Sequence, residues 1–111
     1  MNGERAMWSK DDIRERVHKD KVLVFGKGTR EAPQCGFTMR AIQVLEQCEV
    51  PFGVINIFDD PSIRPALIEY SGWPTTPQVF IGGEFVGGSD VVLEMYQAGE
   101  LQQKIAEATG S

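Results

Sequence analysis

Cysteine and histidine are scarce in this sequence, which has only Cys35, Cys48 and His18 of these residue types among 111 residues. A structural zinc site needs four ligands and usually contains CxxC pairs, so this set argues against zinc. A disulfide framework is not expected either, since two cysteines in a small chain are typical of a reducing compartment. The two thiols also lie at opposite ends of one predicted helix, roughly 20 Å apart. A disulfide requires Cα atoms within about 7 Å, so we expect both thiols to be free.

Long hydrophobic runs and an excess of positive charge are also missing. No stretch approaches the roughly 18 apolar residues of a membrane span, and the first residues, MNGERAM, lack the apolar segment of a secretory signal. Eleven Lys and Arg against sixteen Asp and Glu give a net charge of −5, which disfavours nucleic acid and anionic lipid. The basic residues at positions 14–21 alternate with acidic ones, as on a solvated helix face. We therefore expect one soluble domain that binds neither nucleic acid nor membranes.

The sequence does contain a continuous alternation of helical and strand patterns, without repeats or a long linker. Helices are predicted over residues 9–19, 35–48, 61–71 and 89–108, the last one broken at Gly99. Strands are predicted over 22–25 and 52–57, and a hairpin over 78–87 that turns at Gly82 and Gly83. A helix between the first two strands implies a parallel pair, whereas the hairpin adds antiparallel strands. The prediction is an α/β fold with a four-stranded mixed sheet and helices on both faces.

Cys35 is the predicted reactive residue because it opens a helix directly after the loop that follows the first strand. A helix N-terminus carries about half a positive charge and free N–H groups, both of which stabilise a thiolate, and Lys27 in the same loop adds positive charge. Cys48 lies on the apolar stripe of that helix and is expected to be an inert buried thiol. Residue 38 is a threonine rather than a second cysteine. The second reactant of Cys35 must therefore come from another molecule.

Two further segments offer backbone groups to an extended ligand. If the bond between Thr76 and Pro77 is cis, the N–H and C=O of Thr76 are free to pair with a peptide, although a plain turn proline is the alternative. Gly88, Ser89 and Asp90 open a helix whose N–H groups suit a carboxylate, and Asp90 suits an ammonium. Taken alone, this second segment is only a capped helix after a glycine turn.

The candidate residues together fit a small ligand with a carboxylate at each end and an amine at one of them. Glutathione has this chemistry. Lys27 and Arg64 would hold its glycine carboxylate, and Thr76 would pair with its cysteine backbone. Ser89 and Asp90 would hold its γ-glutamyl end, which places the sulfur of glutathione beside Cys35.

Four motifs, KGT (27–29), PQCGFT (33–38), WPTTPQ (73–78) and GGSD (87–90), occur in this order. Through them the chain resembles a monothiol glutaredoxin of the CGFS type, from about residue 9 to residue 105. The long loop between Lys27 and Cys35 is also similar to this class. The resemblance implies a thioredoxin-like fold, with a flexible segment over 1–8, the glutaredoxin domain over 9–108 and a tail over 109–111. Two residues depart from the family pattern: Thr38 replaces the usual serine, and Ser89 replaces the cysteine that many members have as a resolving thiol.

The resemblance further implies an iron–sulfur carrier. Two subunits would each contribute Cys35 as a metal ligand, and two glutathiones or related thiols would complete the four sulfurs around a 2Fe–2S cluster. The cluster-bridged homodimer would pass its cluster to apo iron–sulfur proteins. Phe37, Trp73 and Pro74 would lie near the subunit interface, and a BolA-type partner in place of the second subunit is left open.

Two other functions use the same fold. A thiol–disulfide oxidoreductase that removes glutathione from proteins needs the same thiolate and groove, so any enzyme activity would be of this kind. A redox-inert interaction domain would need neither. The family resemblance favours the mitochondrial matrix, with a bacterial cytoplasm or a plastid as alternatives.

Overall fold

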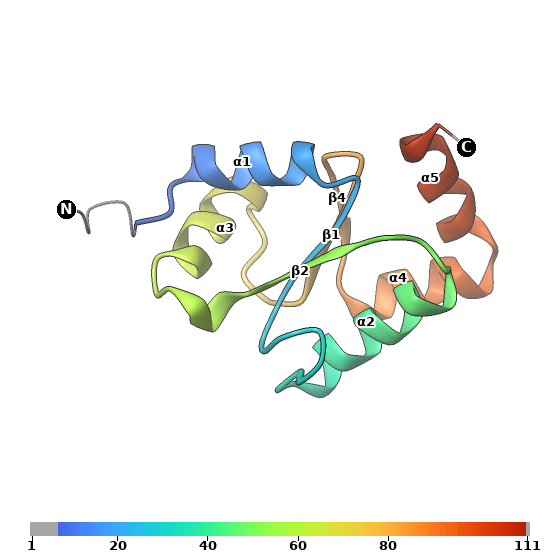
Figure 1. The fold of residues 1–111 in the computed structure, drawn as a ribbon, viewed down its shortest axis with the longest axis horizontal. Coiled ribbons are helices and arrows are strands. Elements are labelled where there is room, and N and C mark those ends of the chain that lie inside the picture. The colour runs from blue at the N-terminus through green and yellow to red at the C-terminus, as the bar shows by residue number, and fades with distance from the viewer. Residues whose placement is uncertain (1–6, 111) are drawn as a thin grey trace.

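A four-stranded sheet organises the chain in the computed structural model, which describes residues 7–110 (Figure 1). The elements in chain order are α1 (Lys10–Lys19), β1 (Val22–Gly26), α2 (Gly36–Gln47), β2 (Gly53–Asn56), the 3-10 helix η2 (Ile57–Asp59), α3 (Ile63–Ser71), β3 (Gln78–Ile81), β4 (Glu84–Gly87), α4 (Ser89–Gln97) and α5 (Glu100–Thr109). The strand order in the sheet is β2-β1-β3-β4. β1 is parallel to β2 and antiparallel to β3, and β3 forms a hairpin with β4. The predicted mixed sheet is thus confirmed.

Alternation along the strands divides the core into two clusters, one on each face of the sheet. Leu23 and Phe25 of β1 belong to the cluster covered by α1 and α3. Val22 and Val24 belong to the cluster covered by α2, α4 and α5. Figure 1 shows the same layers, with α1 beside α3 on one side and α2 beside α4 on the other. The helices therefore cover both faces of the sheet, as predicted.

A local signal explains where α1 begins. The side chain of Ser9 accepts from the Asp12 N–H, and the Asp12 carboxylate accepts from the Ser9 N–H, which forms a capping box at the predicted start of α1. The residue before it, Trp8, is also packed: its N–H donates to Ser62 Oγ at 2.7 Å, and its side chain contacts the first core cluster. Of the predicted N-terminal segment, residues 1–6 lie outside the described part of the chain.

β2 is shorter at its C-terminal end than predicted, and the reason is a side-chain cap. Asn56 Oδ1 accepts from the Phe58 N–H at 3.0 Å, which turns residues 57–59 into η2 instead of continuing the strand. α3 begins at Ile63, two residues later than predicted, because Asp60 binds the N–H and the hydroxyl of Ser62 in the connecting turn. These differences move element ends and leave the topology unchanged.

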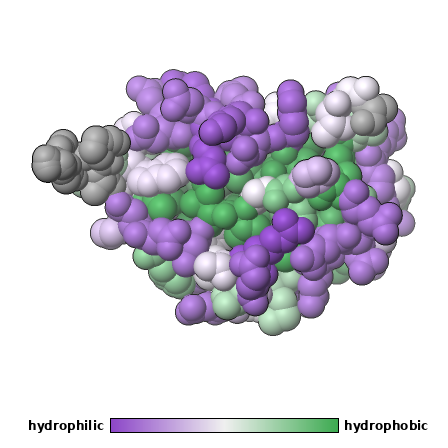
Figure 2. Space-filling view, in the orientation of Figure 1, coloured by the Kyte–Doolittle hydropathy of each residue, from purple (hydrophilic) through white to green (hydrophobic). Residues whose placement is uncertain are grey.

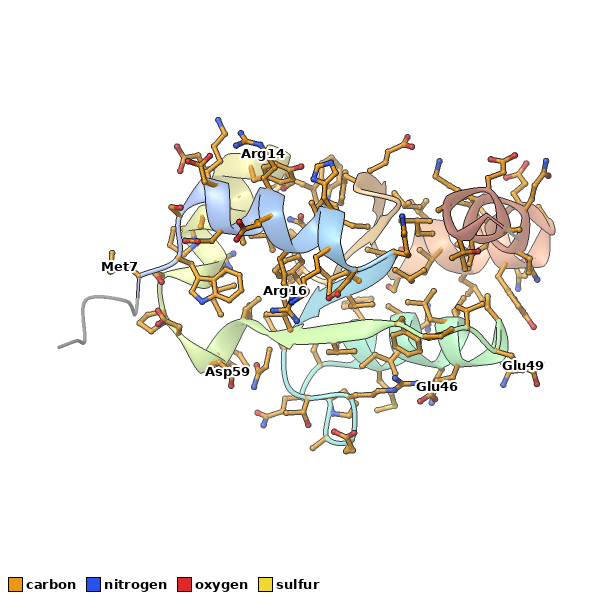
Figure 3. All side chains as sticks on the ribbon, turned by 45° about the horizontal axis from the view of Figure 1, so that its top comes forward. Met7, Arg14, Arg16, Glu46, Glu49 and Asp59 are labelled. Carbon is orange, nitrogen blue, oxygen red and sulfur yellow. The ribbon has the colours of Figure 1, made fainter. Side chains whose placement is uncertain are left out.

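The basic residues of α1 lie on a solvated face. Arg14 pairs with Asp11 at 2.6 Å and Arg16 pairs with Asp20 at 3.2 Å, all within the helix or at its end. In Figure 3, Arg14 points outward while Arg16 points toward β2. Figure 2 shows this hydrophilic face bordering hydrophobic surface between α1 and β2. Among residues 7–110, no helix has both the length and the apolar character needed to cross a membrane.

Candidate functional site

Cys35 occupies the N-cap position of α2, with extended backbone angles of φ −149° and ψ 134°. Its thiol is partly exposed and free. The pKa of the Cys35 thiol is lowered, chiefly because the Thr38 backbone N–H favours the thiolate. Partial burial opposes this shift, while the Phe37 N–H, the Thr38 hydroxyl and the charge of Lys27 support it. The helix N-terminus therefore activates the thiol as expected, and Lys27 is the smallest of these contributors.

The loop before α2 is held in place by hydrogen bonds to its backbone near Lys27. The Lys27 N–H donates to Thr38 Oγ1 at 3.1 Å, and the Lys27 carbonyl accepts from the Gln34 N–H at 2.8 Å. The next N–H, that of Gly28, donates to Asn56 Oδ1 at 3.0 Å. Gly28 has a φ of +97°, which favours glycine, and a Cβ there would lie 2.5 Å from the Ala32 carbonyl oxygen. Lys27 and Cys35 are thus presented by an ordered loop.

The departure at residue 38 has a packing explanation. Thr38 is completely buried, and a Cβ on Gly26 would lie only 2.6 Å from its methyl carbon Cγ2. The methyl group therefore occupies the space left by the missing side chain of Gly26. The hydroxyl keeps its bond to the loop, so threonine retains the polar function and adds a buried apolar contact.

The tip of the same loop is anchored by Arg30, which the sequence analysis did not single out. The guanidinium carbon lies 3.8 Å from the centroid of the Phe52 ring, and Nη1 donates to the Phe52 carbonyl at 3.2 Å. Nε lies 3.5 Å from Glu46 Oε2, and Figure 3 shows Glu46 on α2. No local pattern marks these contacts, because they join segments that are distant in the sequence.

A groove of about 550 Å³ runs beside Cys35. Every predicted site residue lines it: Lys27, Cys35, Arg64, Thr76, Pro77, Gly88, Ser89 and Asp90. The remaining lining residues are Phe37, Trp73, Thr75 and Val91. The Thr76–Pro77 bond is cis, as the sequence analysis considered. The structure therefore brings the predicted residues together from four separate segments, although their roles stay predictions.

Polar contacts already exist at two of these residues. Arg64 Nη2 donates to the Pro74 carbonyl at 3.2 Å, so part of its guanidinium binds the loop that borders the groove. Asp90 Oδ1 lies 3.5 Å from Arg40 Nη1 on α2, an exposed ion pair that the sequence analysis missed. Such pairs are weak and easily rearranged. Asp90 can therefore accept a ligand ammonium at little cost.

The N-terminus of α4 completes the groove. Gly88 is its N-cap and makes no side-chain cap, and the helix begins at the buried Ser89. The first N–H groups of a helix lack intrahelical acceptors, so this end of α4 can bind a carboxylate.

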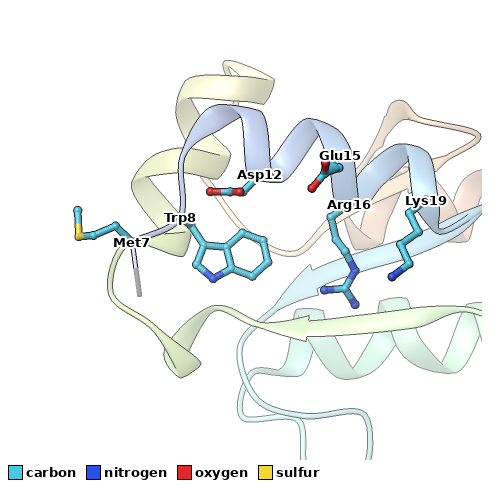
Figure 4. Close-up of a pocket in the computed structure, with 6 residues that line it drawn as sticks. All are labelled: Met7, Trp8, Asp12, Glu15, Arg16 and Lys19. Carbon is cyan, nitrogen blue, oxygen red and sulfur yellow. The ribbon is translucent and has the colours of Figure 1, made fainter. Parts of the chain in front are cut away.

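A second hollow of about 440 Å³ lies along α1 (Figure 4). It is lined by Met7, Trp8, Asp12, Glu15, Arg16 and Lys19. Trp8 and Arg16 extend from the α1 side into the space beside β2. No thiol and no predicted site residue lines this hollow, so the groove beside Cys35 is the better candidate for the chemistry.

Fold and groove together define a thioredoxin-like domain with one activated thiol. The family model described as Glutaredoxin matches residues 22–86, and the chain belongs to the glutaredoxin family. It is 46% identical over 97 residues to Glutaredoxin 4 of Haemophilus influenzae, and the aligned region covers 87% of this chain and 91% of that protein. It is also 46% identical to the chloroplastic monothiol glutaredoxin-S14 of Arabidopsis thaliana, covering 89% of this chain and 57% of that longer protein. The predicted monothiol class is confirmed.

Solved structures of similar proteins have the same fold. The solution structure of reduced poplar apo GrxS14 has a TM-score of 0.80 and 43% identity, covering 92% of this chain and 94% of that chain. A buckwheat structure titled as a glutaredoxin–glutathione complex has a TM-score of 0.82 and 26% identity, covering 98% of this chain and 97% of that chain. The thioredoxin-like fold predicted from the resemblance is therefore confirmed.

Proposed function

We propose that this monothiol glutaredoxin binds glutathione beside Cys35, holds a 2Fe–2S cluster between two copies of the chain, and transfers it to apo-proteins. The observation that carries the proposal is the isolation of the activated thiol. Cys35 lines an open groove, residue 38 is a buried threonine, and Cys48 lies beyond the other end of α2. Cys48 is the only other cysteine of the sequence, so no second thiol lies beside Cys35 among residues 7–110.

The ligand count supports a shared cluster. A 2Fe–2S cluster takes four soft ligands, typically thiolates. Within residues 7–110, no group of three or more Cys, His, Asp or Glu side chains could hold a metal ion. The missing sulfurs would come from a second Cys35 and from two glutathiones. Because glutathione is held by noncovalent contacts, such a cluster is cargo that can be released.

The groove has the groups that glutathione requires. Lys27 and Arg64, which line the groove, would supply cations for the glycine carboxylate, and the Thr76 backbone would pair with the cysteine residue. The N-terminus of α4 suits the γ-glutamyl carboxylate, and Asp90 suits the ammonium. The structural similarity to a glutaredoxin–glutathione complex supports this ligand.

Apolar residues around the groove support a dimer. Phe37 is 57% exposed and Trp73 is 49% exposed, and both line the groove with the partly exposed Val91. Exposed aromatic residues that cluster around a site are typical of protein interfaces. A second copy that shares the cluster would cover these side chains.

The lowered pKa of Cys35 also favours a second activity, removal of glutathione from proteins. The Cys35 thiolate would attack the glutathione sulfur of a protein–glutathione disulfide and release the protein thiolate. A second glutathione thiolate would then attack the new disulfide, which returns the Cys35 thiolate and forms oxidised glutathione. This cycle needs no resolving cysteine, in agreement with Ser89 in that position.

Anaerobic reconstitution with iron, sulfide and glutathione tests the carrier function. We expect a brown dimer with visible absorption bands and about one iron per chain, as one 2Fe–2S cluster per dimer requires. Omission of glutathione is the control and should prevent cluster formation. A colourless, iron-free monomer in the complete mixture would contradict the proposal.

Titration with glutathione tests the groove separately. Lys27→Ala and Asp90→Ala should each weaken binding about 10- to 150-fold, the range expected for a lost charge-assisted hydrogen bond. Lys104→Ala and Asp11→Ala are matched controls, because these residues form exposed ion pairs and do not line the groove. Equal affinities in all four variants would show that the assigned contacts are wrong.

The recipient apo-proteins, a BolA-type partner and the mitochondrial matrix stay predictions. The relatives described above include a bacterial protein and a chloroplastic one. Similar proteins also include a mitochondrial one, because the mitochondrial monothiol glutaredoxin-S15 of Arabidopsis thaliana is 44% identical over 102 residues.

A further inference from the structure

Gln78, the first residue of β3, is completely buried. Its Nε2 donates to the Trp73 carbonyl at 2.9 Å and to the Thr75 carbonyl at 3.1 Å. These carbonyls belong to the segment between α3 and β3, residues 72–77, which we call the groove loop. Trp73, Thr75, Thr76 and Pro77 of this loop line the groove. One buried amide therefore holds two points of the loop that borders the site.

The oxygen of the same amide lacks, within the described part of the chain, the hydrogen-bond partner that buried polar atoms in proteins usually have. Gln78 Oε1 is buried and has no hydrogen-bond partner among residues 7–110. Exchanging the amide oxygen and nitrogen would not help, because the oxygen would then face two carbonyl oxygens. A buried acceptor without a partner is unfavourable, and an apolar side chain of this size would avoid that penalty. The two donated bonds are what a glutamine contributes here.

A second side chain binds the carbonyl between these two. Arg64 Nη2 donates to the Pro74 carbonyl at 3.2 Å from the exposed side chain of α3. Three consecutive loop carbonyls, at residues 73–75, thus accept from side chains of neighbouring elements. None of these three bonds uses the backbone of Thr76, the residue assigned to the ligand.

We propose that Gln78 is a positioning residue that holds the groove loop and so presents the Thr76 backbone to the ligand. The alternative is that Gln78 only fills the core. A buried polar group with an unsatisfied atom is typical of places where a protein gives up stability for function. The role in ligand binding rests on the proposed glutathione site, whereas the role in holding the loop stands on the contacts alone.

Gln78→Met tests the proposal, because methionine has similar length and flexibility but donates no hydrogen bond. Gln78→Asn is a second variant, which keeps the amide on a shorter side chain that cannot span both carbonyls. Val79→Ala is the matched control, since Val79 is the next residue of β3, completely buried, and packs in the second core cluster. Two properties are measured: the order parameters of the Thr75 and Thr76 backbone amides from NMR relaxation, and glutathione affinity at a temperature where all variants are folded.

We expect both Gln78 variants to have lower order parameters at the two loop amides and to bind glutathione about tenfold more weakly, as the loss of one or two ordinary hydrogen bonds predicts. Val79→Ala should lower the melting temperature but leave both properties at the wild-type level. The proposal is overturned if the Gln78 variants change only the melting temperature, as the control does. If the wild-type protein does not bind glutathione, the proposed function fails, while the order parameters still decide the role of Gln78.

Discussion

Each end of α2 has a cysteine, and the pKa values of the two thiols are shifted in opposite directions. Cys35 is the N-cap, where donors from Thr38 and Phe37 lower the pKa of its thiol. Cys48 is the C-cap, where no such donors face it and burial raises the pKa of its thiol. Because all peptide N–H groups of a helix point toward its start, only one end can stabilise an anion. The direction of the backbone, rather than the residue type, therefore decides which thiol reacts.

The surroundings of the two thiols differ as well. Cys35 opens into the groove with Lys27 and the start of α4, whereas Cys48 packs against the second core cluster. Cys48 is partly exposed rather than buried as the sequence analysis expected, and its apolar neighbours offer no partner for the charge of a thiolate. Replacing Cys35 and replacing Cys48 should therefore have different effects on cluster binding.

The largest expected effect comes from replacing each cysteine in turn. Cys35→Ser should abolish cluster binding in anaerobic reconstitution, because a hydroxyl is a poor ligand for iron in such clusters. Cys48→Ser should reconstitute like the wild-type protein, and iron counting and absorption spectra measure both. Iron retained by the Cys35 variant, or lost by the Cys48 variant, would reverse the assignment of roles.

A smaller effect is expected from the threonine that links the loop to the thiol. Thr38→Val leaves the Lys27 N–H without its acceptor, which should cost about 1–3 kcal/mol of unfolding free energy and raise the pKa of Cys35. Thr38→Ser keeps the hydroxyl and loses only a buried methyl group, which should cost about 1 kcal/mol and leave the thiol pKa nearly unchanged. Denaturant unfolding and the pH dependence of alkylation check these values. Identical thiol pKa values in the two variants would show that the hydroxyl has no electrostatic role.

The smallest expected effect is on the pH dependence of stability and of thiol alkylation. The folded-state pKa of Cys35 lies below its unfolded value, so its contribution to stability is present above the unfolded pKa and is lost as pH falls through the folded pKa. The raised pKa of Cys48 has the opposite sign, so its contribution is lost as pH rises through the folded pKa, above the ordinary value of 9.0. We expect iodoacetamide to alkylate Cys35 at a lower pH than Cys48, as measured by peptide mass spectrometry.

Stability supplies an independent check of the same comparison. Above pH 9.0, the ordinary thiol pKa, Cys48→Ser should lose less unfolding free energy than the wild-type protein. Equal alkylation midpoints for the two cysteines, or equal alkaline destabilisation of the two proteins, would contradict the assigned environments.

Much of the fold and the site was predictable because the relevant signals are local. Apolar periodicity marked the helices and strands, and Ser9 with Asp12 marked the start of α1. The loop glycines and Pro33 placed Cys35 at a helix start. The short motifs then identified the residues that line the groove. The strand end at Asn56 was missed, because a single side chain capped η2 against the preference of the apolar run.

The contacts that hold the site were not predictable in the same way. Arg30 binds Phe52 across 22 positions, and Arg64 binds Pro74 across 10. The Thr38 methyl fills the space above Gly26, and Arg40 pairs with Asp90 from another helix. None of these pairs repeats with a helical or strand period, so no periodic pattern in the sequence indicates these contacts.

The sequence by itself determined that one thiol, and no second one nearby, would stand at the start of a helix. Its spacing and composition are enough for that, since a helix start and an apolar stripe are properties of short segments. Only the tertiary structure decided which side chains surround the thiol, how Thr38 and Gly26 share one space, and why a buried glutamine binds the groove loop. These depend on segments that meet only after the sheet has formed.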